Sequence, residues 1–134
     1  HRLLYTRSMK IYVVDDASFI RIICRYHLTR AGYELIGETH DGDIALQEIQ
    51  TLQPDCVVMD LALPNRSGVE IMRELQDKFP QIHFLVITAL DRDIFDQTGS
   101  DIRVSGFLTK PFEGEDLVNE VRNIEQQLGK DNHG

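Results

Sequence analysis

The run of residues 56–60, Cys-Val-Val-Met-Asp, constrains the fold most, because four apolar residues end abruptly on a carboxylate. A strand that helices cover on both faces is continuously apolar and rich in β-branched residues. The run therefore predicts a buried strand that carries Asp60 at its carboxyl end. A carboxylate in that place costs free energy unless a cation or hydrogen-bond donors meet it, so a partner must come from elsewhere in the chain.

Five apolar runs of this kind recur along the chain, separated by segments whose apolar residues have helical spacing. They predict strands at residues 10–14, 33–37, 56–60, 82–87 and 104–109. Strands that alternate with helices form a parallel sheet covered on both faces. For a five-stranded flavodoxin-like sheet a common order is 2-1-3-4-5, in which strands one and three are neighbours where the winding reverses. The sequence therefore predicts a doubly wound α/β fold with three layers.

The segments between the strands carry helix start and stop signals. Ser18 can cap a first helix that Gly32 ends. The turn at residues 41–43 opens a second helix that ends before Pro54, and a third helix closes before Pro80. The final helix has an apolar stripe formed by Leu117, Val121, Ile124 and Leu128.

The fourth helix should lie in residues 90–103, where the helical pattern is weakest. Gly99 lowers helix propensity by about 1 kcal/mol. The apolar residues of this segment are too sparse for a full buried stripe. We therefore expect the fourth helix to be short or mobile.

Polar residues end four of the five predicted strands. Because crossovers between parallel strands are right-handed, these residues should share one edge of the sheet: Asp15, Asp16, Asp60, Thr88 and Lys110. Three crowded carboxylates need protons or a cation, and their hard oxygen atoms favour Mg²⁺, for which Mn²⁺ can substitute. Asp15 and Asp16 are the candidate metal ligands.

Lys110 and Thr88 add further chemistry to this cluster. Lys110 starts about 10 Å from the strand of Asp60, two strand spacings away, so only its long side chain can reach the carboxylates. An ammonium, a hydroxyl and a metal ion suit the oxygens of a phosphoryl group. Asp60 is then the candidate nucleophile that forms an acyl phosphate. Taken singly, these residue types are more often turn formers or helix caps, and only their coincidence at one edge favours a site.

Composition excludes several classes of protein. The chain has 134 residues, 42% of them hydrophobic, and a formal charge of −8. These values predict a globular domain and argue against direct nucleic-acid binding through a basic face. No apolar run reaches the length of about 20 residues that a membrane span needs. We therefore expect a cytoplasmic location without membrane contact.

Residues 9–128 are expected to form the domain. Residues 1–8 are interpreted as an N-terminal extension, native or added, and residues 129–134 as a polar, frayed tail or linker stub. Cys24 and Cys56 fall inside predicted elements and are interpreted as reduced core thiols. Three histidines without ligand spacing are interpreted as surface or packing residues, namely His27, His40 and His83.

Four motifs stand at specific separations in the chain. They are Val-Val-Asp15-Asp16, Val-Met-Asp60 followed by Leu63-Pro64 and Gly68, Thr88-Ala89, and Gly106-Phe107-Leu-Thr-Lys110-Pro111-Phe112. With these motifs, about residues 9–128 resemble the receiver domain of the bacterial response regulator family. In size the chain is similar to the single-domain chemotaxis regulators of that family.

The resemblance implies a phosphorylation-activated switch of a two-component system. A histidine kinase or a phosphotransfer protein would donate a phosphoryl group to Asp60. Mg²⁺ would be bound by Asp15, Asp16, Asp60 and the backbone carbonyl of Ala62. The resemblance implies no enzyme activity beyond the domain's own phosphorylation and dephosphorylation.

The resemblance also implies how the signal leaves the site. Thr88 would move to hydrogen-bond the phosphoryl group, and Phe107 would rotate into the space that Thr88 vacates. The movement would change the face made by the fourth helix, the fifth strand and the fifth helix, which would bind a downstream protein or effector domain, or form a phosphorylation-dependent dimer. The Lys110-Pro111 peptide is expected to be cis. Without the motif around it, Phe107 would be an ordinary core aromatic.

Two alternatives from other classes stay open. An aspartyl-phosphate phosphatase of the haloacid dehalogenase type also uses a strand-end aspartate and Mg²⁺, but its second acid would fall on Ala62 and is missing. A receiver-like binding module that works without phosphorylation is the other alternative. The chain also departs from the family pattern just before the fifth strand, where Ile102-Arg103-Val104 replaces the usual Ala-Gly-Ala-like turn. This departure, like the weak helical pattern before it, favours a short or mobile fourth helix.

Overall fold

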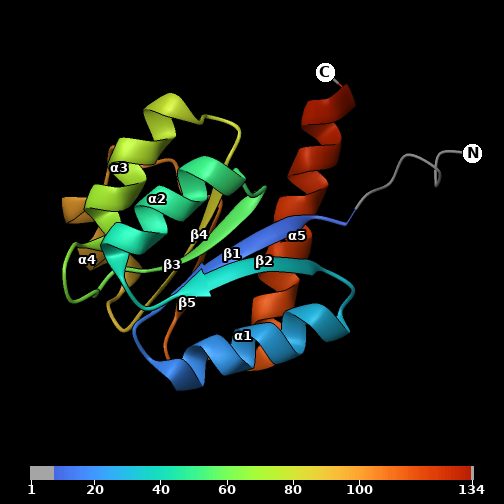
Figure 1. Ribbon diagram of the computed structural model, residues 1–134, viewed down its shortest axis with the longest axis horizontal. Helices are drawn as coiled ribbons and strands as arrows, with labels where there is room; N and C mark the ends of the chain where they lie inside the picture. Colours follow the sequence, from blue (N-terminus) through green and yellow to red (C-terminus); the bar gives the residue numbers. More distant parts are fainter. Residues whose placement is uncertain (1–7, 134) are drawn as a thin grey trace, which may run out of the picture.

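The computed structural model describes residues 8–133, which form a parallel five-stranded sheet with helices on both faces (Figure 1). The strand order is β2-β1-β3-β4-β5, and every neighbouring pair is parallel. This order confirms the predicted doubly wound fold. In chain order the elements are β1 (Lys10–Val14), α1 (Ser18–Arg30), β2 (Glu34–Thr39), α2 (Gly42–Leu52), β3 (Cys56–Asp60), α3 (Gly68–Lys78), β4 (His83–Thr88), α4 (Arg92–Thr98), β5 (Gly106–Thr109) and α5 (Gly114–His133).

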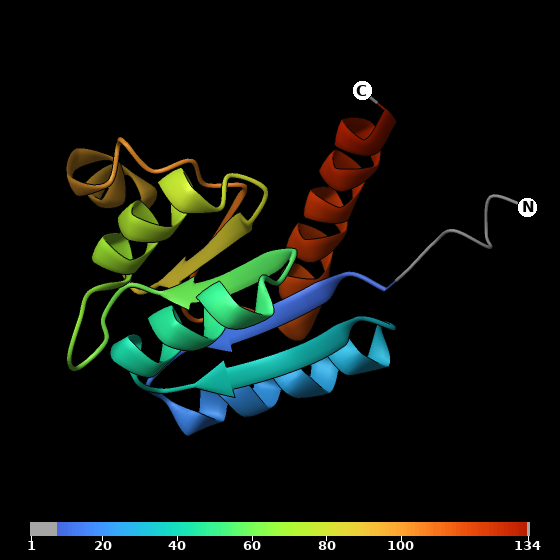
Figure 2. The ribbon, with the colours of Figure 1, turned by 45° about the horizontal axis from the view of Figure 1, so that its top comes forward.

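Two hydrophobic cores fill the space between the sheet and its helices. Because successive strand residues face opposite sides of a sheet, Ile11 and Val13 of β1 join the core with α1 and α5, whereas Tyr12 and Val14 join the core with α2 and α3. Phe95 of α4 belongs to the second core. Figures 1 and 2 show α1 and α5 on one face and α2, α3 and α4 on the other. The central strands are therefore apolar on both faces.

The ends of two helices differ from the predictions. Ser18 is the first residue of α1, and Ala17 takes the N-cap position without a side-chain bond. The Asp15 carboxylate starts this turn instead, because its Oδ1 accepts a hydrogen bond from the Ala17 N–H at 2.9 Å. The final helix does not end at Leu128 but continues to His133, so residues 129–133 are helical.

Three strands also have different ends from those expected, and β4, predicted at residues 82–87, covers His83–Thr88. β2 extends to Thr39, and its pairing with β1 shifts by one residue between Ile11 and Tyr12. Gly37 lies against Tyr12 at this shift, and a Cβ on Gly37 would approach Tyr12 Cε2 to 2.6 Å. β5 is shorter than predicted, because its pairing with β4 begins only at Gly106.

The fourth helix is short, as predicted, with seven residues and a single buried side chain, that of Phe95. Polar contacts to α3 hold the loop that follows it. The Arg73 guanidinium contacts both Asp101 carboxylate oxygens at 2.6 and 2.9 Å. Gln76 Nε2 donates to the Asp101 carbonyl at 2.9 Å, and Gln76 Oε1 accepts from the Arg103 N–H at 3.0 Å. The mobility of α4 stays a prediction.

The remaining expectations concern cysteines, histidines and the N-terminal extension. Cys24 and Cys56 are free and buried, as predicted. His40 is exposed, and His27 and His83 are partly buried, as expected for surface or packing residues. Of the N-terminal extension, residues 1–7 lie outside the described part of the chain.

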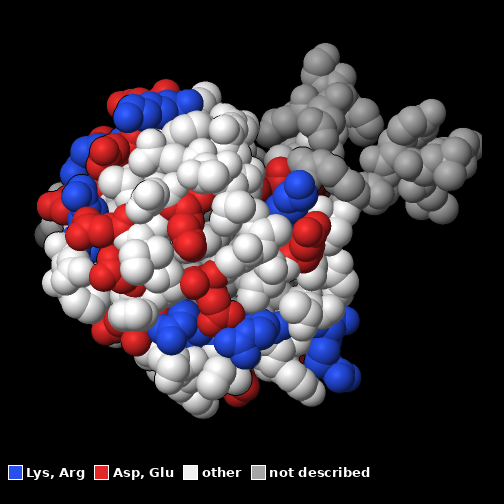
Figure 3. Space-filling view, viewed as in Figure 1, with Lys and Arg blue, Asp and Glu red and all other residues white. Residues whose placement is uncertain are grey.

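Within residues 8–133, every helix is too short or too polar to cross a membrane. On the face drawn in Figure 3, basic and acidic side chains are interspersed and form no continuous basic patch.

Gly68, the first residue of α3, gives a test of how tightly the turn after β3 is packed. Its N–H donates to the Leu61 carbonyl at 3.0 Å, and a Cβ here would collide with the backbone carbonyl oxygen of Asp60. Overpacking of this kind costs about 1–3 kcal/mol, so Gly68→Ala should lower the free energy of unfolding by about that amount in a urea titration.

Gly129→Ala is the matched control, because a Cβ on this α5 glycine meets nothing within 4 Å. Alanine is the better helix former by about 1 kcal/mol, so this variant should be as stable as the parent or more stable. Equal stability of the two variants would contradict the packing described for Gly68.

Candidate functional site

The five residues predicted to share one edge of the sheet do so. Val14 pairs with Met59, which sets the ends of β1 and β3 side by side, and Thr88 pairs with Thr109, which sets the ends of β4 and β5 side by side. The carboxyl ends of four strands thus meet, as the strand order requires. The residues brought together are Asp15, Asp16, Asp60, Thr88 and Lys110.

Three carboxylates form an acidic cluster at this edge. One oxygen from each of Asp15, Asp16 and Asp60 lies within 4.8 Å of the others. Asp15 is fully buried and Asp60 is 4% exposed, whereas Asp16 is exposed. Like charges at this separation repel each other, and more strongly where water is excluded.

Lys110 supplies the positive charge that the cluster needs. Its Nζ lies 2.8 Å from Asp15 Oδ2 and 3.5 Å from Asp60 Oδ2. Burial lowers the pKa of the Lys110 ammonium, but the close approach of Asp15 and the charge of Asp60 outweigh that effect and raise this pKa above its ordinary value. Lys110 is therefore charged at neutral pH, and it reaches the cluster from β5 as predicted.

One ammonium does not neutralise three acids, and the uncompensated negative charge affects the pKa of Asp60. Burial, and then the charge of Asp15, raise the pKa of Asp60 to about 6, against the opposing effects of Lys110 and the Ala62 N–H. The Ala62 N–H donates to Asp60 Oδ1 at a long 3.3 Å. The carboxylate of Asp60 is thus less stabilised than that of an exposed aspartate.

The donor set fits a hard divalent cation. Asp15 Oδ2 is buried and accepts no well-aligned hydrogen bond from the described residues, although Lys110 faces it. Asp16 Oδ atoms make no hydrogen bond or ion pair with another residue of the described chain. Carboxylate oxygens with open positions are the ligands that Mg²⁺ takes. The cluster of Asp15, Asp16 and Asp60 could therefore hold a metal ion.

A cleft of about 400 Å³ opens beside the cluster. Thr88 is 3% exposed, and its Oγ1 accepts a hydrogen bond from the Leu90 N–H at 3.1 Å, which leaves the hydroxyl proton for another acceptor. The apolar part of the lining includes Leu61, which the sequence did not single out. The cleft is lined by Asp16, Asp60, Leu61, Ala62, Thr88, Ala89, Leu90 and Lys110.

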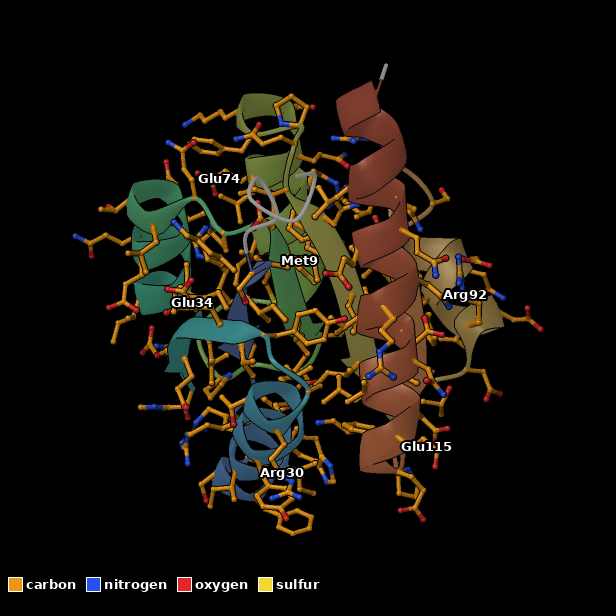
Figure 4. All side chains as sticks on the ribbon, turned by 90° about the vertical axis from the view of Figure 1, so that its right-hand side faces the viewer. Met9, Arg30, Glu34, Glu74, Arg92 and Glu115 are labelled. Carbon is orange, nitrogen blue, oxygen red and sulfur yellow. The ribbon has the colours of Figure 1, made fainter. Side chains whose placement is uncertain are left out.

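Phe107 lies outside the acidic cluster and connects β5 with α4. Its ring centroid is 5.7 Å from that of Phe95, and the guanidinium carbon of Arg92 lies 5.1 Å from the Phe107 ring centroid. Figure 4 shows Arg92 on α4, across the molecule from Glu34 at the other edge of the sheet. The peptide between Lys110 and Pro111 is cis, as expected.

Arg21 also contacts the site, and sequence reasoning missed it. Its Nη1 donates to the backbone carbonyl oxygen of Asp15 at 2.6 Å. In the sequence Arg21 is one of several arginines in a predicted helix, where charged side chains usually face water. Only the turn between β1 and α1 brings it back to the acids.

The raised pKa of Asp60 makes the stability of the metal-free protein depend on pH. Between about pH 4 and about pH 6 the folded state binds more protons at Asp60 than the unfolded state does, so stability falls as pH rises through this window. Asp60→Asn removes the titration. At pH 7 this variant should be more stable than the parent by up to about 3 kcal/mol, and the difference should vanish near pH 4.

Urea titrations with a chelator at several pH values measure this difference. Asp77→Asn is the control, because it removes one negative charge at an exposed position of α3. A pH-independent gap between Asp60→Asn and the parent would show that Asp60 does not titrate abnormally.

Known proteins resemble this chain over most of its length. The family described as response regulator receiver domain matches residues 11–122. The chain is 33% identical over 117 residues to the alkaline phosphatase synthesis transcriptional regulatory protein PhoP of Bacillus subtilis, with 87% of this chain covered but only 48% of PhoP. It therefore spans about half the length of that relative.

Two further relatives are covered almost completely. The chemotaxis protein CheY of Thermotoga maritima is 28% identical over 115 residues, which are 86% of this chain and 96% of CheY. The receiver domain of AraT, a response regulator from Geobacillus stearothermophilus, has a solved structure that superposes with a TM-score of 0.85, at 26% identity over 94% of this chain and 99% of that domain. The matched range begins within β1 and ends within α5, and the chain belongs to the response regulator receiver domain family.

Proposed function

We propose that this receiver domain is switched by phosphorylation of Asp60, with Mg²⁺ as cofactor and a histidine kinase or phosphotransfer protein as donor. One observation carries the proposal: Lys110 Nζ lies 2.8 Å from Asp15 and 3.5 Å from Asp60 in a cluster of three acids beside an open cleft. A carboxylate nucleophile, a fixed cation and metal ligands at one place are what transfer of a phosphoryl group requires.

Each residue has a separate role in the proposed transfer. An Asp60 oxygen attacks phosphorus, so that an oxygen–phosphorus bond forms while the bond between phosphorus and the donor's histidine nitrogen breaks. Lys110 and the Thr88 hydroxyl bind the phosphoryl oxygens. Asp15, Asp16, Asp60 and the Ala62 carbonyl would hold Mg²⁺, which supplies neutralisation of the phosphoryl charge.

The proposed relay starts at Thr88 and ends at the α4–β5–α5 face. A hydroxyl that turns toward the phosphoryl group gives up part of the space next to β5, and Phe107 moves into that space. Phe107 contacts Phe95 and Arg92, so its movement would shift α4. This face would then bind a downstream protein or effector domain, or a second copy of the domain.

Acetyl phosphate with Mg²⁺ tests the phosphoacceptor. Intact-mass spectrometry should show one added phosphoryl group on the parent and on Asp77→Asn, and none on Asp60→Asn. Lys110→Met should reduce the yield strongly, because the developing charge loses its fixed cation. An adduct that persists on Asp60→Asn would place the nucleophile elsewhere, and a parent without any adduct would favour a binding module that works without phosphorylation.

The short α4 should respond to phosphorylation by becoming ordered. Because only Phe95 of α4 is buried, the amides of residues 92–98 should exchange faster than those of β3 in the free protein. Phosphorylation, or beryllofluoride as its mimic, should slow their exchange, since a bias of a few kcal/mol is enough to reverse two populations. Amides of α4 that exchange as slowly as those of β3 before phosphorylation would show a preformed helix.

A further inference from the structure

Arg21, in the first turns of α1, is tied to the loop that carries two of the three acids. Its Nη1 donates to the Asp15 carbonyl oxygen at 2.6 Å, and its Nε lies 3.4 Å from Glu38 Oε1 of β2. The side chain is 18% exposed, so water competes little for these contacts. None of the roles proposed for phosphoryl transfer uses Arg21.

The hydrogen bond from Arg21 fixes one particular peptide plane. The Asp15 carbonyl oxygen belongs to the peptide that joins Asp15 to Asp16. The preceding peptide is already held, because the Asp15 N–H donates to the Thr39 carbonyl at 3.1 Å. The Asp15 carboxylate is also held, by the Ala17 N–H at 2.9 Å and by Lys110 at 2.8 Å.

Asp16 lacks such support of its own. Its carboxylate is exposed and has no hydrogen-bond or ion-pair partner elsewhere in residues 8–133, so only its backbone fixes the place from which the side chain extends. That backbone begins at the peptide which Arg21 fixes. The peptide after Asp16 is held by the Ala17 N–H, so Arg21 and this bond together set the place from which Asp16 presents its oxygens to the cluster.

We propose that Arg21 is a positioning residue for the metal site, which orients the Asp15–Asp16 peptide so that both carboxylates face one cation. The proposal rests on the proposed function, in which these acids bind Mg²⁺. Groups that orient the ligands of a metal change its affinity by about 10–100-fold when they are removed, although they never touch the ion.

If Arg21 acted through its charge alone, its removal would change the Mg²⁺ affinity in the opposite direction. A guanidinium beside a cation site repels the cation, so its removal should tighten Mg²⁺ binding. A positioning role predicts weaker binding in spite of the lost repulsion. The direction of the change thus separates the two explanations.

Arg25 provides a matched control on the same helix. Its Nε and Nη2 contact the same carboxylate of Glu38 at 2.8 and 3.0 Å, but no contact joins Arg25 to Asp15. Arg25→Gln removes one positive charge and one partner of Glu38, as Arg21→Gln does. Only Arg21→Gln frees the Asp15–Asp16 peptide.

Calorimetric titration of the purified chain with MgCl₂ tests the proposal. The dissociation constant of Arg21→Gln should rise by about tenfold, whereas that of Arg25→Gln should stay at the parent value or fall. Arg21→Met keeps the aliphatic packing of the side chain and should show the same loss as Arg21→Gln, which covers the case in which Arg21→Gln folds poorly. At saturating Mg²⁺ the phosphorylation yield from acetyl phosphate should return to that of the parent.

A readout without metal checks the geometry itself. Amide exchange at Ala17, whose N–H bonds the Asp15 carboxylate, should be faster in Arg21→Gln than in Arg25→Gln, with the amides of β1 unchanged in both. Unchanged or tighter Mg²⁺ binding in both Arg21 variants would overturn the positioning role alone. A parent that binds no Mg²⁺ would overturn this role together with the proposed function.

Discussion

The contact of Lys110 with Asp15 and Asp60 is the interaction on which the rest of this site depends. Both carboxylates are buried, and a buried acid without a partner costs several kcal/mol. The strand order makes the contact possible, because it sets β1 beside β3 and leaves β5 only two strands from β3. A lysine side chain spans that distance. An order that separated β1 from β3 would bury two acids in different places and give a single lysine to one of them.

The sequence predicts the sheet and its reactive edge because both follow from simple periodicities. Apolar runs define the strands, and the polar residues that end them must meet at one edge whatever the side chains do. Contacts between side chains lie beyond this reasoning, and Arg21 is the main example, since a helical arginine carries no sign that it turns back to Asp15. The predicted ends of helices were wrong for a related reason. Residues 129–133 lack an apolar stripe yet continue α5, and the Asp15 carboxylate takes the capping role predicted for Ser18 at the start of α1.

The attachment of α4 differs in kind from that of the other helices. α3 buries Gly68, Ile71, Met72 and Leu75, while α4 buries only Phe95. The contacts that fix the following loop to α3 are exposed hydrogen bonds of Gln76 and one ion pair. In that pair Arg73 and Asp101 are about half accessible to water, and such ion pairs contribute little to stability. Because α4 buries fewer side chains than α3, we expect this helix, next to Phe107, to shift more easily than α3, as a relay through Phe107 would need.

The two buried acids are not equivalent, and their difference favours Asp60 as the nucleophile. Asp15 is fully buried, and its two oxygens have close partners at 2.9 Å and 2.8 Å. Asp60 lines the cleft, and its contacts are longer, at 3.3 Å to the Ala62 N–H and 3.5 Å to Lys110. An oxygen that must give up close contacts to attack phosphorus reacts more slowly than one that is loosely held, because the lost contacts add to the barrier. The fold thus gives Lys110 a tight partner in Asp15, which fixes the ammonium in place, and leaves the oxygens of Asp60 open to an incoming phosphoryl group.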